Sequence, residues 1–191
     1  MKRKILLFII SFCTILFILL LKNNNTRLEL NSDKDFEKVE QFFREKFKEY
    51  DNKFTSVTFF ITPNNPFLEK IVVNYDEEEI NYKRIWDTTN GFIELAPTQA
   101  LHSTFGMDKI QLTLFPKYIE QAKQIILEKD NNYQDFRIKN ISYHSINNDI
   151  SIQFRIFARY INTSSLGKDD LDYTEFNFFV DKKNKVKLMG D

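Results

Sequence analysis

An uncharged apolar run of seventeen residues, from Ile5 to Leu21, sets the first limit on what this chain can fold into. As a helix rising about 1.5 Å per residue, it would span roughly 25 Å, slightly less than a hydrocarbon core of about 30 Å. Lys4 and Lys22 flank the run and can extend to the headgroups on either side. We therefore predict a transmembrane anchor over residues 5–21, preceded by a cytoplasmic basic stub (1–4) and followed by a spacer (22–30).

Cleavage of this N-terminal run and lipidation of Cys13 are the alternatives to a retained helix, and each requires particular residues around the processing site. Cleavage requires small side chains before the cut, but Leu19 to Leu21 stand there, and neither Gly nor Ala occurs before Gly91. Lipidation of Cys13 requires a small residue directly before it, where the chain has Phe12. The sequence favours a retained helix, and secretion or lipid anchoring after processing stays open as the alternative.

The charges around the run predict its orientation. Lys2, Arg3 and Lys4 precede it, whereas Lys22 and Arg27 follow. The positive-inside rule places the N-terminus in the cytoplasm and residues 31–191 outside the cell membrane. Cys13 is the only cysteine, so this exported domain forms no disulfide and no thiolate metal site.

The charge balance of the exported domain limits its partners. Without the five basic residues and Glu29 that precede Asn31, 22 Lys and Arg face 26 Asp and Glu, a net charge of −4. Nucleic-acid binding needs clustered cations on phosphates. We therefore expect no nucleic-acid partner.

Two amphipathic helices stand out by their spacing. An apolar stripe with helical period predicts a helix over residues 33–50, with Ser32 or Asp33 as its cap. A second helix is predicted over residues 116–129, because Pro116 suits a first turn and the apolar residues after it share one face. Residues 96–114 show no clear periodicity.

Period-two alternation predicts strands in both halves of the domain. The clearest case is Ile150 to Tyr160, and a change of phase near Asn140 predicts a β-bulge. Phe60 and Phe157 fall on the strand face opposite the main apolar row. The predicted strands cover residues 55–61, 71–75, 80–86, 91–95, 136–143, 150–160, 174–180 and 186–188.

These elements predict an α+β fold with a mainly antiparallel sheet and two packing helices after the transmembrane helix. Each half, residues 31–100 and 115–191, reads as a helix followed by a meander. This plan is that of cystatin-like and NTF2-like folds, so the domain is either a tandem pair or one long sheet with two helices.

The sequence contains no constellation of residues typical of catalysis. His102 lies beside Ser103 and near Asp108, but nucleophile-elbow glycines are missing. His144 has no acidic or histidine neighbour at metal-ligand spacing. We expect no enzymatic activity, no metal and no small-molecule cofactor.

An acidic run, Asp76, Glu77, Glu78 and Glu79, is the candidate binding feature. Consecutive carboxylates do not match the spacing of a calcium loop. We interpret the run as a solvated hairpin tip, and alternatively as a patch that offers negative charge to a basic protein partner.

In its N-terminal run, length and alternating strands, the chain resembles small membrane-anchored exported proteins of low-GC Gram-positive bacteria. These include uncharacterised lipoprotein-like families and TipC-type immunity proteins. The resemblance implies a membrane-tethered extracytoplasmic protein that binds another protein at the outer membrane face. The alternatives are an accessory subunit of an envelope or secretion complex, or an envelope-acting enzyme.

Overall fold

The computed structural model describes residues 28–63, 66–99, 103–147, 149–161 and 173–190. Two α-helices, eight β-strands and three short 3-10 helices make up this part of the chain. In chain order the elements are α2 (Asp33–Lys46), η1 (Lys48–Tyr50), β1 (Phe54–Ile61), β2 (Leu68–Glu77), β3 (Ile80–Asp87), β4 (Gly91–Gln99), η2 (Met107–Lys109), η3 (Leu112–Leu114), α3 (Phe115–Lys129), β5 (Tyr133–Ile146), β6 (Asp149–Tyr160), β7 (Tyr173–Val180) and β8 (Val186–Leu188).

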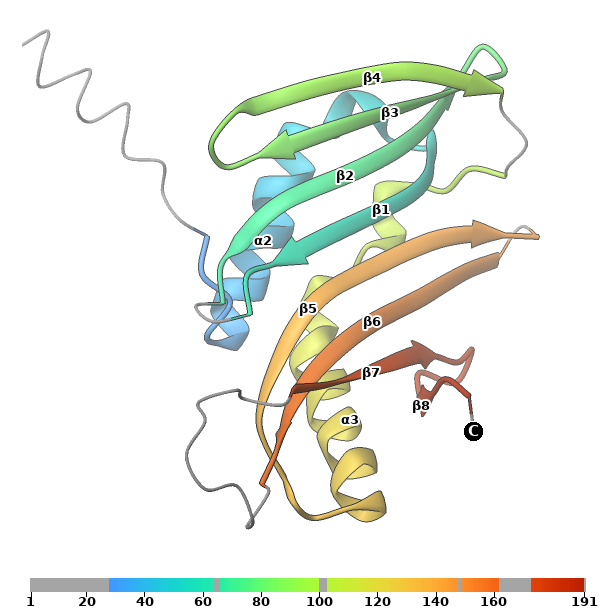
Figure 1. Cartoon of the computed structure of the whole chain (residues 1–191). Coiled ribbons are helices and arrows are strands. Elements are labelled where there is room, and N and C mark those ends of the chain that lie inside the picture. The colour runs from blue at the N-terminus through green and yellow to red at the C-terminus, as the bar shows by residue number, and fades with distance from the viewer. Residues whose placement is uncertain (1–27, 64–65, 100–102, 148, 162–172, 191) are drawn as a thin grey trace, which may run out of the picture.

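All eight strands form one antiparallel sheet in the order β4-β3-β2-β1-β5-β6-β7-β8 (Figure 1). Each helix precedes a four-stranded meander, and the two meanders join where β1 pairs with β5. Their registered residues run from Ser56 opposite His144 to Phe60 opposite Asn140. The α+β class with a mainly antiparallel sheet and two packing helices is therefore confirmed, and the two meanders form one long sheet.

Both helices cover the same face of this sheet. Alternate strand residues are apolar, so one face of the sheet is apolar and packs against the helices. On β1, Val57, Phe59 and Ile61 are buried, whereas the residues between them are only half-buried. Helix residue Phe43 packs on Phe59 with ring centroids 5.3 Å apart. Phe115 of α3 packs in the same way on β6. Neither α2 nor α3 lies on the opposite face of the sheet, which we call the open face.

Helix α2 begins as expected and ends earlier. The Asp35 carboxylate accepts hydrogen bonds from the Ser32 backbone N–H (3.0 Å) and hydroxyl (2.8 Å), closing the first turn. The predicted end at Tyr50 is wrong, because the helix stops at Lys46 and Phe47 adopts φ −116° and ψ 15°. A short 3-10 turn follows, which keeps both Phe47 and Tyr50 buried in the core.

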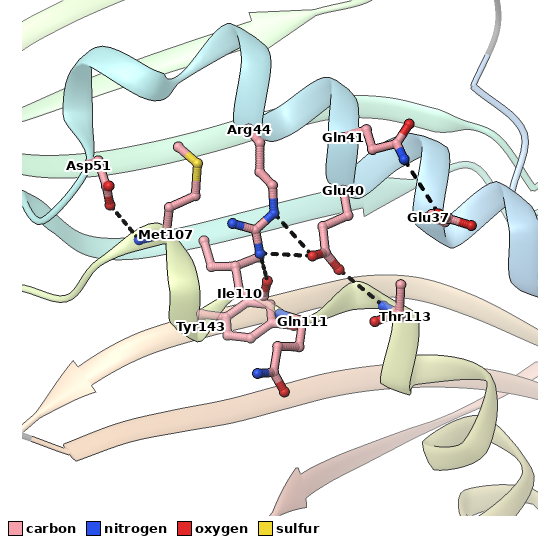
Figure 2. A network of polar contacts seen from close by, with 10 residues as sticks. All are labelled: Glu37, Glu40, Gln41, Arg44, Asp51, Met107, Ile110, Gln111, Thr113 and Tyr143. Atoms are coloured by element: carbon pink, nitrogen blue, oxygen red, sulfur yellow. Dashed lines mark hydrogen bonds and ion pairs between the residues drawn. The ribbon is translucent and has the colours of Figure 1, made fainter.

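The segment between β4 and α3, which has no periodicity, is fastened by polar side chains (Figure 2). Arg44 on α2 forms an ion pair with Glu40 (2.8 Å) and donates to the Ile110 carbonyl (3.0 Å). The Asp51 carboxylate accepts from the Met107 backbone N–H at 2.7 Å. The hydroxyl of Tyr143 accepts from the backbone N–H of Gln111 at 3.3 Å. Backbone groups of an irregular segment are thereby satisfied by side chains from both halves of the domain.

The strand predictions differ from the structure mainly at their ends. Strand β5 is longer than predicted, and its pairing with β6 shifts between Ile138 and Asn140, which confirms the expected bulge.

The predicted anchor, residues 5–21, lies outside the described residues. Within the described part of the chain, no helix is long and apolar enough to cross a membrane.

Candidate functional site

The acidic run Asp76–Glu79 forms the tip of the hairpin between β2 and β3. Glu78 and Glu79 make the turn with φ of 51° and 65°, and β3 begins directly after them. Two consecutive left-handed residues are typical of a type I′ turn. The hairpin position is confirmed, and the partner-binding role of the run stays a prediction.

Only part of the run offers free negative charge. Glu77 accepts from the Lys53 ammonium at 2.5 Å, and Asp76 accepts from the Asn81 amide at 2.7 Å. Glu78 and Glu79 are exposed, and no described residue pairs with their carboxylates. The tip therefore projects two carboxylates into solvent.

Ser103 and Asp108, two of the residues considered for catalysis, each interact with another side chain. Ser103 shares a hydrogen bond with the Ser145 hydroxyl (2.5 Å), and Asp108 pairs with Lys109 (3.0 Å). His144 is half-buried on β5, and burial lowers the pKa of its imidazole. His102 lies outside the described residues. No group of three His, Cys, Asp or Glu side chains in the described ranges is placed to hold a metal.

The open face carries a shallow polar hollow of about 330 Å³ over β5, β6 and β7. Three of its residues lie in one registered row, since Asn140 pairs with Arg155 and Arg155 with Asn177. The polar residues that line it are Asn140, Ser142, His144, Gln153, Arg155 and Asn177.

A basic–aromatic cluster lies beside the hollow, where β5, β6 and β7 continue past the end of β1. Its members are Asp135, Arg137, Lys139, Phe157, Tyr173 and Glu175. The Lys139 ammonium lies 4.8 Å from the Phe157 ring centroid, and the Arg137 guanidinium lies 4.8 Å from that of Tyr173. Such cation–π pairs hold long cationic side chains against the sheet.

The acidic members of this cluster are held as carboxylates. Arg137 donates to both oxygens of Asp135 (3.0 and 2.5 Å), and this contact is the main cause that lowers the pKa of that carboxyl. Lys139, the main cause, together with Arg155 lowers the pKa of Glu175 in the same way. Hydrogen bonds to the charged form and opposite charges both act in this direction.

A larger groove of about 480 Å³ lies on the helix side, between the start of α2, the body of α3 and β5. Its ionic side chains are mostly paired with one another. Glu120 accepts from Lys123 at 2.6 Å, and Asp135 accepts from Arg137. Most of the charged side chains that line this groove are therefore already engaged with one another.

Strand β4 forms one edge of the sheet and exposes apolar side chains on both faces. Phe92, Ile93 and Leu95 are 41%, 39% and 41% exposed. Phe92 packs on Phe47 at the helix side (5.5 Å between centroids), whereas Ile93 pairs with Ile85 on the open face. Within the described residues, nothing pairs with the outer edge of β4.

Sequence reasoning missed both the hollow and the edge. Asn140, Arg155 and Asn177 look like ordinary solvent positions in three separate strands, and only the sheet register brings them together. The signal at β4 was present in the sequence, because Phe92, Ile93 and Leu95 do not alternate cleanly. A strand apolar on both faces at a sheet edge leaves apolar surface uncovered.

Comparisons with known proteins give little further information. No family model matches the chain, and no curated protein matches it. A crystal structure of a "putative lipoprotein" from Clostridium difficile is similar over 80% of this chain and 90% of that one, with 18% identity and a TM-score of 0.36.

Proposed function

We propose that the chain is a membrane-tethered extracytoplasmic binding protein that engages another protein through the edge strand β4. The predicted anchor over residues 5–21 and its basic flank support the tether and the orientation. The exposed apolar edge of the sheet supports a protein partner. An immunity-type role at the outer membrane face is the specific form of this proposal.

The observation that carries the proposal is the contrast between the two edges of the sheet. At one edge, β8 is three residues long and presents Lys187, which is how proteins commonly blunt an edge. At the other edge, β4 is nine residues long and exposes Phe92, Ile93 and Leu95. A long apolar edge left open is a template for another strand.

The geometry of β4 indicates which kind of segment would pair with it. Main-chain N–H and C=O groups of an edge strand bind an extended segment, and flanking side chains select its residues. Pro97 has no N–H, so pairing is expected along residues 91–96. Because Phe92 lies on the helix side and Ile93 and Leu95 on the open face, the added segment should carry apolar residues opposite them on each face.

Site-specific photo-crosslinking in intact cells tests this proposal on the full chain. A photoreactive amino acid at Leu95 should capture one protein partner. The same residue at Leu127, which is 39% exposed on α3, serves as the matched control. Capture from Leu95 and not from Leu127 is the expected result, and equal products from both sites would contradict docking at β4.

A second variant separates docking from folding. Leu95→Lys places a charge on the edge and should abolish capture by a photoreactive residue at Ile93, whereas Leu127→Lys should leave it intact.

Extraction of membranes with alkaline carbonate tests the tether separately, because a spanning helix stays with the lipid. Recovery of the chain in the soluble fraction would contradict the tether and leave the docking result standing.

A further inference from the structure

The polar hollow on the open face contains hydrogen-bonding groups that the fold does not use. The side chains of Asn140, His144 and Asn177 make no hydrogen bond to another described residue. In the helix-side groove, by contrast, Asp135 and Glu120 are held by Arg137 and Lys123. Amides and an imidazole that converge on one hollow without partners are typical of a recognition site.

The charge of the hollow has one sign. Among the described residues that line it, Arg155 alone carries a charge, and none is a carboxylate. One terminal nitrogen of Arg155 donates to Glu175 at 3.1 Å, and Lys139 binds the other oxygen of the same carboxylate at 2.7 Å. A guanidinium has five N–H donors, so Arg155 keeps donors for a ligand.

The residues directly opposite His144 on the two flanking strands are uncharged. Its registered neighbours on the two flanking strands are Ser56 on β1 and Ser151 on β6. The Ser142 hydroxyl, on the same strand, lies 3.1 Å from that of Thr58. An acidic group placed in the hollow would therefore meet donors from β5, β6 and β7, and none of the described residues that line the hollow is a carboxylate. Glu175, which binds Arg155 and Lys139, lies beside it.

From this geometry we infer that the polar hollow binds a carboxylate carried by an acidic segment of a protein or peptide. Arg155 supplies the charge, and the Asn140 and Asn177 amides supply neutral donors on either side of it. A planar guanidinium matches the two oxygens of a carboxylate. A phosphate group carries a charge of about −1.5 to −2 at pH 7, more than the single guanidinium among the described lining residues would balance.

This site is distinct from the docking edge. The hollow lies on β5, β6 and β7, whereas β4 is the outermost strand of the other meander (Figure 1). The inference therefore does not rest on the tether or on strand addition at β4.

The experiment follows side-chain amide signals by NMR in the full chain in detergent micelles. The probe is a capped tri-glutamate peptide, with the tri-glutamine peptide and inorganic phosphate at equal ionic strength as comparisons. The signals of Asn140 and Asn177, assigned with Asn→Ser variants, should shift saturably with tri-glutamate alone. No shift, an equal shift with tri-glutamine, or an equal response to phosphate would each overturn the inference.

A variant pair tests the role of Arg155. Arg155→Gln should weaken binding of tri-glutamate by at least about tenfold, because hydrogen bonds to charged groups are the stronger class. Lys83→Gln, on the open face of the other meander, removes an equal charge and should leave binding unchanged. Retained affinity in Arg155→Gln, or an equal loss in Lys83→Gln, would overturn the assignment.

Discussion

Arg44 on the first helix donates a hydrogen bond at 3.0 Å to the carbonyl of Ile110, 66 positions later in the chain. The same guanidinium pairs with Glu40, and the other Glu40 oxygen accepts from the Thr113 backbone N–H at 3.2 Å. Two side chains a helical turn apart thus satisfy backbone groups of the segment that leads to α3 (Figure 2). This contact ties α2 to the segment that leads into α3.

Replacing Arg44 by Met should lower the free energy of unfolding by about 1–3 kcal/mol. The substitution keeps much of the apolar stem but removes the side-chain donor to the Ile110 carbonyl and the ion-pair partner of the half-buried Glu40 carboxylate. Urea unfolding measures the change. Glu45→Gln, at an exposed position of the same helix, should stay within about 0.5 kcal/mol of the wild type. Equal losses in both variants would show that Arg44 contributes no more than an ordinary surface charge.

Buried tyrosines should make the protein lose stability at alkaline pH. Burial is the main cause that raises the pKa of Tyr75 to about 12, with its hydrogen bond to Glu94 as the next cause. Burial also raises the pKa of Tyr143. Unfolded tyrosine ionises near about pH 10. Stability is therefore fully present below that pH and falls as the pH rises toward the folded values.

Urea unfolding from about pH 8 to about pH 11 measures this loss. The Tyr75→Phe and Tyr143→Phe variants cannot ionise at these positions, so their free energy of unfolding should decline less steeply with pH. Tyr160→Phe, at an exposed position, is the control and should follow the wild type. A wild-type pH slope in the buried variants would refute the assignment.

His144 should make the protein lose stability at acidic pH. Because burial lowers the pKa of its imidazole, the unfolded chain takes up this proton first as the pH falls below about 6.5. Stability is full above that value and declines as the pH falls through the folded pKa. Stability measured against pH should be flatter in His144→Asn than in His102→Asn, which alters the only other histidine. Identical profiles for the two variants would exclude this role of His144.

The regular elements of the fold were predictable because burial imposes a period on the sequence. Strands β1, β6 and β7 alternate, since one face of each packs on helices, and α2 carries its stripe for the same reason. Phe60 and Phe157 were expected on the opposite face, and Lys70 and Lys139 lie over their rings at 4.8 Å each. These predictions needed only the pattern of one element at a time.

The features that were not predicted from the sequence depend on contacts between residues far apart in the chain. The η2 and η3 turns are held by Asp51 and Tyr143, which the local sequence does not reveal. The polar hollow forms only when β5, β6 and β7 come into register. An edge strand has no burial period to detect, so β4 was predicted too short, ending at residue 95 instead of Gln99.

The acidic hairpin tip should become more stable when its turn residues suit its backbone. Glu78 and Glu79 hold φ of 51° and 65°, a region that costs most side chains roughly 1–2 kcal/mol and that Asn and Gly tolerate. The double variant Glu78→Asn, Glu79→Gly should therefore raise the free energy of unfolding by about 1–2 kcal/mol. Glu78→Gln, Glu79→Gln removes the same charges without relieving the backbone, and should change stability by less than about 0.5 kcal/mol. Urea unfolding distinguishes the two variants. Equal stability of both would show that the left-handed backbone of Glu78 and Glu79 does not destabilise the wild-type turn.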